Sequence, residues 1–389
     1  MSRARWRLAL TSTLLVGLVR IALAEARVLP VGVFYTSRNT DARYVDTVAR
    51  KLKSAHFNTV VATETFTKET IDVFQKHGIA VVSRNPALMA HPGVTAGWLG
   101  TSEQPGTRAD FAALKAQYLE HGTNAPKPFV TCLPGEEMGL YGPTDPRAFW
   151  YELRPSLRCF RWYGISRSHY GILHKPSTEG RLSMPAIMTV GAQARKTPYW
   201  VTFQAFGRNE HEAMYSNPSA AQIQCMMHLG LAYRARGILL WGLQNVGEWQ
   251  CLLDEKTLQP TDAKFAAASK MAGLIAKHSD LLASLEHSGV SFQCPNPIVY
   301  PIPVKPGKDG KPAVYVVNRD TRNPAKATLR IWSETHTWTK ATDVFAGTDL
   351  QIQPPNQDGD MTITLTLAPG EGKLITTDVE GKKKKKKKK

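Results

Sequence analysis

Alternation of short apolar segments with amphipathic helical segments constrains the fold of this chain more than any other feature. From Val28 onward, apolar runs typical of buried strands alternate with segments whose apolar residues recur at helical spacing. The helix expected over residues 41–56 carries four apolar residues on one face: Tyr44, Val45, Val48 and Leu52. Eight such strand–helix units fit within residues 25–285, which matches the size and repeat of a (β/α)8 TIM barrel.

The expected boundaries follow from the apolar runs and from helix start and stop signals. The expected strands are 28–35, 58–62, 79–83, 94–99, 128–133, 157–163, 199–206 and 237–243. The expected helices are 41–56, 68–77, 108–121, 146–153, 181–195, 219–235 and 261–282. The helix at 219–235 has a clear start signal, because Ser219 follows Asn217 and Pro218.

The pattern changes after about residue 285, where two-residue alternation replaces helical spacing. Alternating runs cover 313–317, 327–332 and 361–367, and turn residues such as Asp309-Gly310 and Pro369-Gly370 separate them. Short alternating strands at this spacing favour a small all-β sandwich. The sequence therefore predicts an α/β protein with a barrel at 25–285 and a sandwich at 286–380.

The N-terminal segment has the features of a signal peptide. A basic head precedes the apolar run Leu8 to Val19, and Ala22-Leu23-Ala24 places small residues where a signal peptidase cleaves. Cleavage after Ala24 would make residues 1–24 the signal peptide and the protein secreted or periplasmic. No later segment has about 20 continuous apolar residues, so we expect no stable membrane insertion after cleavage.

The net charge of +17 would suggest nucleic-acid binding if it were spread over the folded body, but most of it lies at the two ends of the chain. Eight positive charges lie in Lys382 to Lys389, and four more in Arg3, Arg5, Arg7 and Arg20, which leaves the body at +5. A mildly basic body of this size does not indicate nucleic-acid binding. Self-repulsion predicts a disordered tail over residues 381–389.

Cysteine and histidine spacing indicates neither a disulfide scaffold nor a metal site. The five cysteines form no Cys-X-X-Cys pair. Cys132 and Cys159 fall near the ends of adjacent expected strands, so they are the pair for one possible bridge, with buried free thiols as the alternative. The histidines at 169, 174 and 211 lack metal-ligand spacing. We expect no metal and no organic cofactor.

Several segments resemble a known group of proteins. Trp98-Leu99-Gly100-Thr101-Ser102-Glu103-Gln104-Pro105 resembles the fourth-strand motif of secreted bacterial barrel proteins related to glycoside hydrolase clan A, including β-galactosidase-like members. Residues 198–207 and 232–241 are similar to the seventh strand and the eighth helix-to-strand step of that group, and 316–320 and 367–372 to its accessory sandwich. The resemblance covers most of the mature chain and implies hydrolysis of glycosidic bonds.

One of the two carboxylates that this chemistry requires is missing from its expected position. Glu103, at the carboxyl end of an expected strand, is the candidate general acid/base, although it could instead cap the helix that begins near Thr107. The group carries a nucleophilic glutamate on the seventh strand, where this chain has Gln204. A second carboxylate is needed. The loop candidates are Glu137 and Glu136, with Glu248 next.

Aromatic residues near the expected strand ends indicate a sugar site, because aromatic faces stack on pyranose rings. The aromatic candidates are Tyr35, Trp98, Trp162, Tyr163, Phe206, Trp241 and Trp249. Packing in the barrel core is the alternative for about half of them. Arg161 could bind an acidic sugar or a neighbouring glutamate, and Gln204 could bind a sugar hydroxyl.

The sequence is compatible with three functions. The first is hydrolysis of a poly- or oligosaccharide, with Glu103 protonating the leaving oxygen. The second is a non-catalytic carbohydrate-binding barrel that lacks the seventh-strand nucleophile. The third is an envelope structural or adhesion protein that uses its lysine tail. Barrels host many chemistries, so the fold does not choose among these functions, and the oligomeric state is not predicted.

Overall fold

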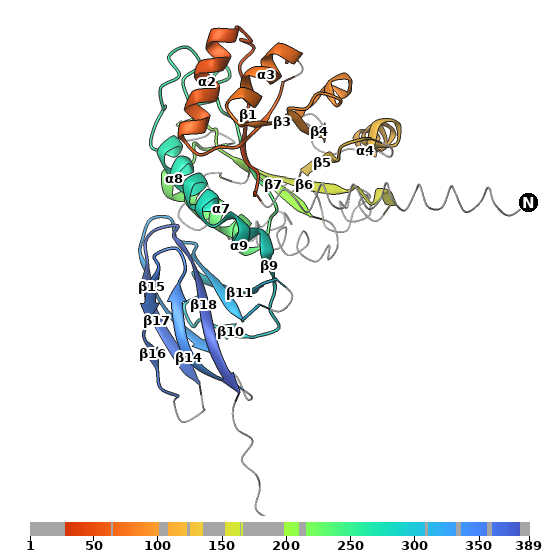
Figure 1. Ribbon diagram of the computed structural model, residues 1–389. Coiled ribbons are helices and arrows are strands. Elements are labelled where there is room, and N and C mark those ends of the chain that lie inside the picture. The colour runs from red at the N-terminus through yellow and green to blue at the C-terminus, as the bar shows by residue number, and fades with distance from the viewer. Residues whose placement is uncertain are drawn as a thin grey trace, which may run out of the picture.

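A closed parallel barrel followed by two antiparallel sheets forms the protein (Figure 1). The computed structural model describes residues 28–63, 65–100, 108–122, 125–134, 152–163, 165, 198–209, 215–307, 310–331, 336–355 and 360–381. The predicted signal peptide, the helix predicted at 181–195 and most of the helix predicted at 146–153 lie outside these residues, as does the lysine run.

The barrel is confirmed by its strand order. Its strands are β1 (Val31–Phe34), β2 (Thr59–Val61), β3 (Ala80–Ser83), β4 (Val94–Gly100), β5 (Phe129–Pro134), β6 (Leu157–Trp162), β7 (Tyr199–Gln204) and β8 (Ile238–Trp241). Each strand pairs in parallel with the next, and β8 closes the barrel on β1 with Leu239 opposite Gly32. All eight strands therefore place their carboxyl ends at one end of the barrel.

The helices begin and end largely where the sequence signals lie. They are α2 (Ala42–Ser54), α3 (Lys68–Lys76), α4 (Arg108–Gln117), α7 (Ala220–Ala232), α8 (Lys264–Lys277) and α9 (Ser279–Ser284), with short helical turns η1 (Pro86–Leu88) and η2 (Tyr118–Gly122). Ser219 and Gln222 form a capping box at the start of α7. The single helix predicted at 261–282 is two helices, because the backbone at His278 leaves the helical region (φ −115°, ψ 22°).

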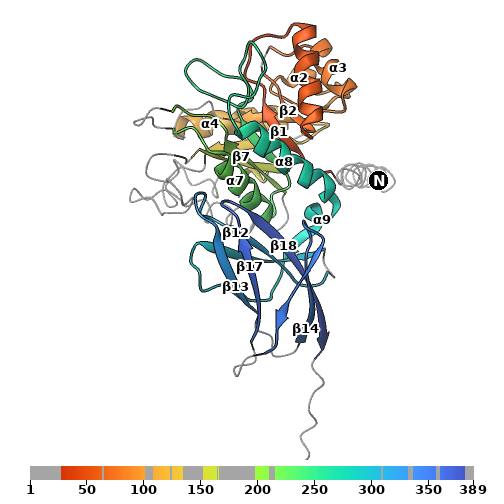
Figure 2. The ribbon, with the colours of Figure 1, turned by 90° about the vertical axis from the view of Figure 1, so that its left-hand side faces the viewer.

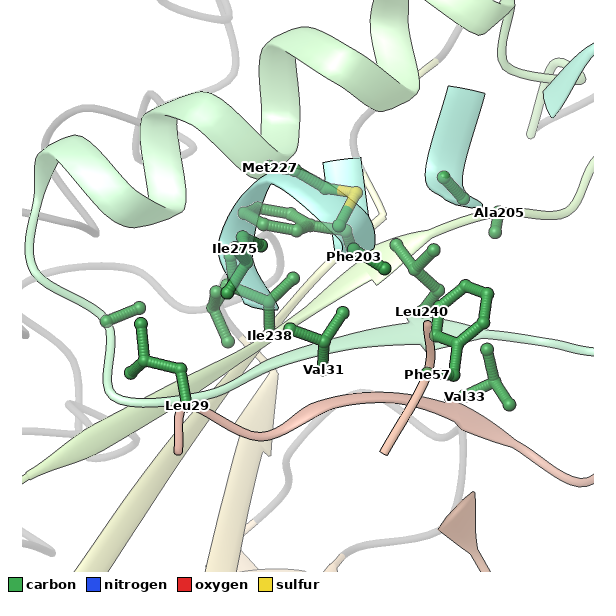
Figure 3. Close-up of a cluster of buried hydrophobic side chains, with 14 of the residues drawn as sticks. Leu29, Val31, Val33, Phe57, Phe203, Ala205, Met227, Ile238, Leu240 and Ile275 are labelled. Atoms are coloured by element: carbon green, nitrogen blue, oxygen red, sulfur yellow. The ribbon is translucent and has the colours of Figure 1, made fainter. Parts of the chain in front are cut away.

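Alternation along the strands separates two apolar layers. Outward residues of β1, β7 and β8 pack beneath α7 and α8, as Figure 3 shows for Val31, Phe203 and Ile238 against Met227 and Ile275. Inward residues form a second cluster that fills the barrel: Phe34, Val61, Val82, Ala96, Trp98, Val130, Cys132, Leu157, Cys159, Trp200 and Leu239. The barrel interior is therefore a packed core, as is usual for this fold.

The C-terminal part is a sandwich of two antiparallel sheets. Its strands are β9 (Leu285–His287), β10 (Phe292–Gln293), β11 (Val299–Pro306), β12 (Ala313–Asn318), β13 (Ala325–Ile331), β14 (His336–Asp343), β15 (Thr348–Leu350), β16 (Ile352–Gln353), β17 (Met361–Leu367) and β18 (Gly372–Gly381). One sheet has the order β10-β13-β17-β16 and the other β15-β14-β18-β12-β11-β9. Gly381, assigned to the tail by sequence, ends β18 and pairs with His336.

Barrel and sandwich share one continuous core. Val314 and Val316 of β12 face the other sheet, whereas Tyr315 and Val317 belong to the core that extends into the barrel. Figure 2 shows α7 and α9 lying directly over the six-stranded sheet. No helix within the described ranges is both long enough and apolar enough to span a bilayer.

Candidate functional site

Aromatic side chains gather where β6, β7 and β8 end. Five rings, from Tyr163, Phe206, Tyr215, Trp241 and Trp249, form a connected set that we call the mouth cluster. Barrel enzymes place their active sites at the carboxyl ends of the strands, and these rings lie at that end. The mouth cluster is therefore the candidate functional site.

Phe206 is the centre of the mouth cluster. Its ring centroid lies 4.5 Å from that of Trp241, 5.1 Å from Tyr163, 5.3 Å from Tyr215 and 5.4 Å from Trp249. Most of these pairs meet edge to face, a favourable aromatic geometry. Tyr163 and Phe206 are buried, whereas the other three rings are half-buried. The cluster therefore has a packed base and three rings that keep part of their surface in solvent.

Two arginines accompany the rings. The Arg208 guanidinium lies 4.7 Å from the centroid of Trp249 and forms an ion pair with Glu248. The Arg161 guanidinium lies 4.9 Å from the centroid of Tyr163. Cations over aromatic faces at these distances are attracted by the ring quadrupole. Glu248, a predicted carboxylate candidate, is thus 61% exposed and paired with a cation at the edge of the cluster.

Gln204 ends β7 opposite Trp241 and is fully buried. Its Nε2 donates to the carbonyls of Phe206 and Ser216, both at 2.9 Å, and its Oε1 accepts from the amide of Ile165 at 3.0 Å. Backbone groups therefore use both amide hydrogens and the amide oxygen. In the structure the amide ties three loop segments together, and its predicted bond to a sugar hydroxyl stays a prediction.

A second polar network lies at the ends of the loops after β7 and β8. Lys264, which is 1% exposed, forms an ion pair with Asp262 at 3.0 Å and also donates to Asn217. Asp262 accepts further bonds from Asn217 at 3.1 Å and Gln250 at 3.3 Å. Burial lowers the pKa of Lys264, while Asp262 opposes that shift. The network fixes Gln250, which directly follows Trp249.

Three other predicted aromatic residues lie away from the mouth cluster. Trp98 points into the barrel, where its ring centroid is 5.0 Å from that of Phe34. Tyr35 and Trp162 point outward and are buried in the layer beneath the helices. The Tyr35 hydroxyl donates to the carbonyl of Asn39, and burial raises its pKa. Core packing, the alternative for such rings, describes the surroundings of all three.

The predicted catalytic carboxylates Glu103, Glu136 and Glu137 lie outside the described residues. Their roles stay predictions. Cys132 and Cys159, predicted as neighbours, are opposite each other on β5 and β6, and all five cysteines are free thiols. In the part of the chain described, no group of three or more potential metal ligands is placed to hold an ion.

Sequence reasoning missed Tyr215, Arg208 and Lys264. Tyr215 and Arg208 lie in the segment after β7. Neither residue lies in a helix or a strand, so no regular spacing of apolar residues predicts that their side chains join the cluster. Lys264 begins α8, a position at which a lysine is normally solvated. Asp262, two residues earlier, was the one sequence signal for burial of Lys264, because a buried ammonium needs an anionic partner.

Comparisons with known proteins find solved structures that overlap loosely with this chain and no match in sequence. No protein-family model matches the chain, and no curated protein resembles it in sequence. An α-L-fucosidase from Bacteroides thetaiotaomicron aligns with 90% of this chain and 93% of its own at 10% identity and a TM-score of 0.49. An arabinofuranosidase from Xanthomonas axonopodis pv. citri aligns over 85% and 89% at 10% identity and a TM-score of 0.48.

A β-galactosidase from the psychrophilic Marinomonas ef1 covers less, with 66% of this chain and 62% of its own aligned at 11% identity and a TM-score of 0.47. Overlaps this loose, between sequences this different, do not assign a function.

Proposed function

We propose that this protein is a secreted glycoside hydrolase that cleaves glycosidic bonds of a poly- or oligosaccharide at the carboxyl end of its barrel. The observation that carries the proposal is the mouth cluster. Its half-buried rings, Trp241, Trp249 and Tyr215, are side chains that stack on pyranose faces while their N–H and O–H groups reach hydroxyls. Three such rings at the end of a closed parallel barrel are suited to a carbohydrate chain.

The proposed chemistry uses two carboxyl groups. Glu103 follows the end of β4 by three residues, and Glu136 follows the end of β5 by two. Glu103 would protonate the oxygen of the leaving sugar, and Glu137 or Glu136 would act as nucleophile or as the base that activates water. Gln204 does not contribute a carboxylate from β7, so the second acid has to come from another loop.

The test is a comparison of wild type with Glu103→Gln on a panel of aryl glycosides and soluble polysaccharides. Removing a general acid should lower the rate roughly 10²–10⁴-fold and leave the melting temperature nearly unchanged. The outcome that contradicts the assignment is unchanged hydrolysis with lowered stability, which would make Glu103 a helix cap.

A carbohydrate-binding barrel without catalysis is the second candidate. The observation that favours it is that Gln204 is hydrogen-bonded to backbone groups on both its amide nitrogen and its oxygen. It lies at the strand end where the glycoside hydrolases that this chain resembles carry a nucleophile. Saccharide binding measured by calorimetry, with no hydrolysis of any substrate by wild type, would select this function over the first.

A further inference from the structure

We infer that Gln204 is a positioning residue that holds the mouth cluster in place, and that its amide cannot be exchanged for a carboxylate. The consequence for sugar binding rests on the proposed function. The structural role of Gln204 can be tested without it. It differs from interpreting Gln204 as the remnant of a lost nucleophile, because both amide hydrogens and the amide oxygen have backbone partners.

The donors and acceptors around Gln204 match an amide. The carbonyl oxygens of Phe206 and Ser216 lie 2.9 Å from its Nε2 and that of Ile165 lies 3.5 Å away, while the N–H of Ile165 donates to its Oε1. An ionised carboxylate only accepts hydrogen bonds, so it would lose both donations and place negative charge against two carbonyls. Because Gln204 is fully buried, a carboxylate there would be out of contact with bulk solvent, which otherwise relieves such a mismatch.

The three backbone partners belong to the segments that carry cluster rings. Ile165 is two residues after Tyr163, Phe206 supplies the central ring itself, and Ser216 directly follows Tyr215. The partner segments also bind each other, because the amide of Ser216 donates to the carbonyl of Ile165 at 2.9 Å. A single side chain therefore fixes the positions of three of the five rings relative to β7.

Gln204→Glu gives a pH signature that a steric defect would not. Above its folded pKa the new carboxylate is ionised and mismatched. When protonated, it donates one hydrogen bond and still accepts one, so part of the native pattern returns. Burial and the carbonyls raise its folded pKa above the unfolded value near 4.3, so the stability deficit is smallest below that value and grows as pH rises.

Two variants complete the comparison. Gln204→Met has a similar shape, bonds to none of the three partners and should show a deficit independent of pH. Gln222→Glu is the matched charge control, because Oε1 of Gln222 accepts from the Ser219 amide at 2.8 Å in the α7 capping box, a position where glutamate is at least as favourable. The titration of other groups is common to all variants and cancels in the differences.

The experiment measures melting temperature from pH 4.5 to pH 8, near-UV circular dichroism, and affinity for the best-bound oligosaccharide. We expect Gln204→Glu to melt about 5 °C or more below wild type at pH 8, with the gap narrowing toward pH 4.5. The aromatic dichroism should change at temperatures well below melting, and affinity should fall about tenfold, as for the loss of a good aromatic contact.

Wild-type stability and dichroism in Gln204→Glu at pH 8 would overturn the inference, as would a deficit that does not change with pH. Failure of wild type to bind any saccharide would instead overturn the proposed function. The dichroism and the pH dependence would still decide whether Gln204 positions the cluster.

Discussion

Nδ1 of His228 lies 2.8 Å from the hydroxyl of Tyr315, and this hydrogen bond joins the barrel to the sandwich. His228 is on α7 and Tyr315 on β12, and both side chains are buried in the shared core. Gly372 of β18 lies against the same imidazole so closely that a Cβ there would come within 2.6 Å of the ring. The two parts are therefore fitted around one buried polar pair.

Replacing Tyr315 with phenylalanine should destabilise the protein by about 1–3 kcal/mol. The ring is kept, but Nδ1 of His228 loses its partner at a site where both side chains are buried. Urea unfolding followed by fluorescence measures the change. Thr328→Val, on the outer face of β13, is a control that should cost little, because the hydroxyl it removes makes only a long, solvent-exposed 3.5 Å contact with Thr364. A loss no larger than that of the control would mean that the pair does not stabilise the joint.

Acidification should destabilise the protein through His228. Burial, together with Lys270 and Lys373, lowers the pKa of His228 to about 3, below the usual value of 6.5. The unfolded chain therefore takes up a proton first, so the stability from neutral His228 is complete above pH 6.5 and is lost as pH falls toward 3. The slope is about 1.4 kcal/mol per pH unit. His228→Gln should flatten the melting temperature over this range relative to wild type, and parallel curves would contradict the assignment.

The barrel was predictable because its signals are local. Each strand is a run of apolar residues, and the strand predicted at 28–35 contains β1 at Val31–Phe34. The alternation over 361–367 gave β17 with its bounds intact, and its residues alternate between the sandwich core and the outer face. The break at His278 was not predicted, since apolar spacing continues across it.

The site was less predictable because its contacts join residues that are distant in the chain. Gln204 stood out as an amide at a strand end, but its role depends on Ile165, 39 residues earlier, and on Ser216, 12 residues later. The pair of Arg208 and Glu248 likewise crosses two loops. Strand-end position alone could not separate the inward Trp98 from Tyr35, because the face of the strand decides which ring enters the barrel.

Thiol reactivity should separate Cys294 from the other four cysteines. Cys294 is half-buried, whereas Cys132, Cys159, Cys225 and Cys251 are buried. We expect one thiol to react with an aromatic disulfide reagent in the native protein and five after denaturation without reductant. Three thiols after denaturation would reveal a bridge, and peptide mapping would then examine Cys132 with Cys159, which pair across β5 and β6.

Replacing Lys264 and replacing its partner Asp262 should destabilise the protein by different amounts. Lys264→Met removes the buried ammonium and leaves Asp262, which is 30% exposed, with bonds from Asn217 and Gln250, so we expect a loss of about 1–3 kcal/mol. Asp262→Asn leaves the cation without its anion at 1% exposure and should cost more at pH 7. Without Asp262, the pKa of Lys264 in the folded protein should fall further below its value in the unfolded chain. The unfolded chain then binds the proton more tightly than the folded protein does. The loss of stability in Asp262→Asn should therefore shrink as pH rises toward 10. Denaturant unfolding at pH 7 and pH 9.5 measures both variants, with Lys270→Met on the exposed side of α8 as the control. A larger loss for Lys264→Met, or a deficit of Asp262→Asn that grows with pH, would contradict a charged, buried Lys264.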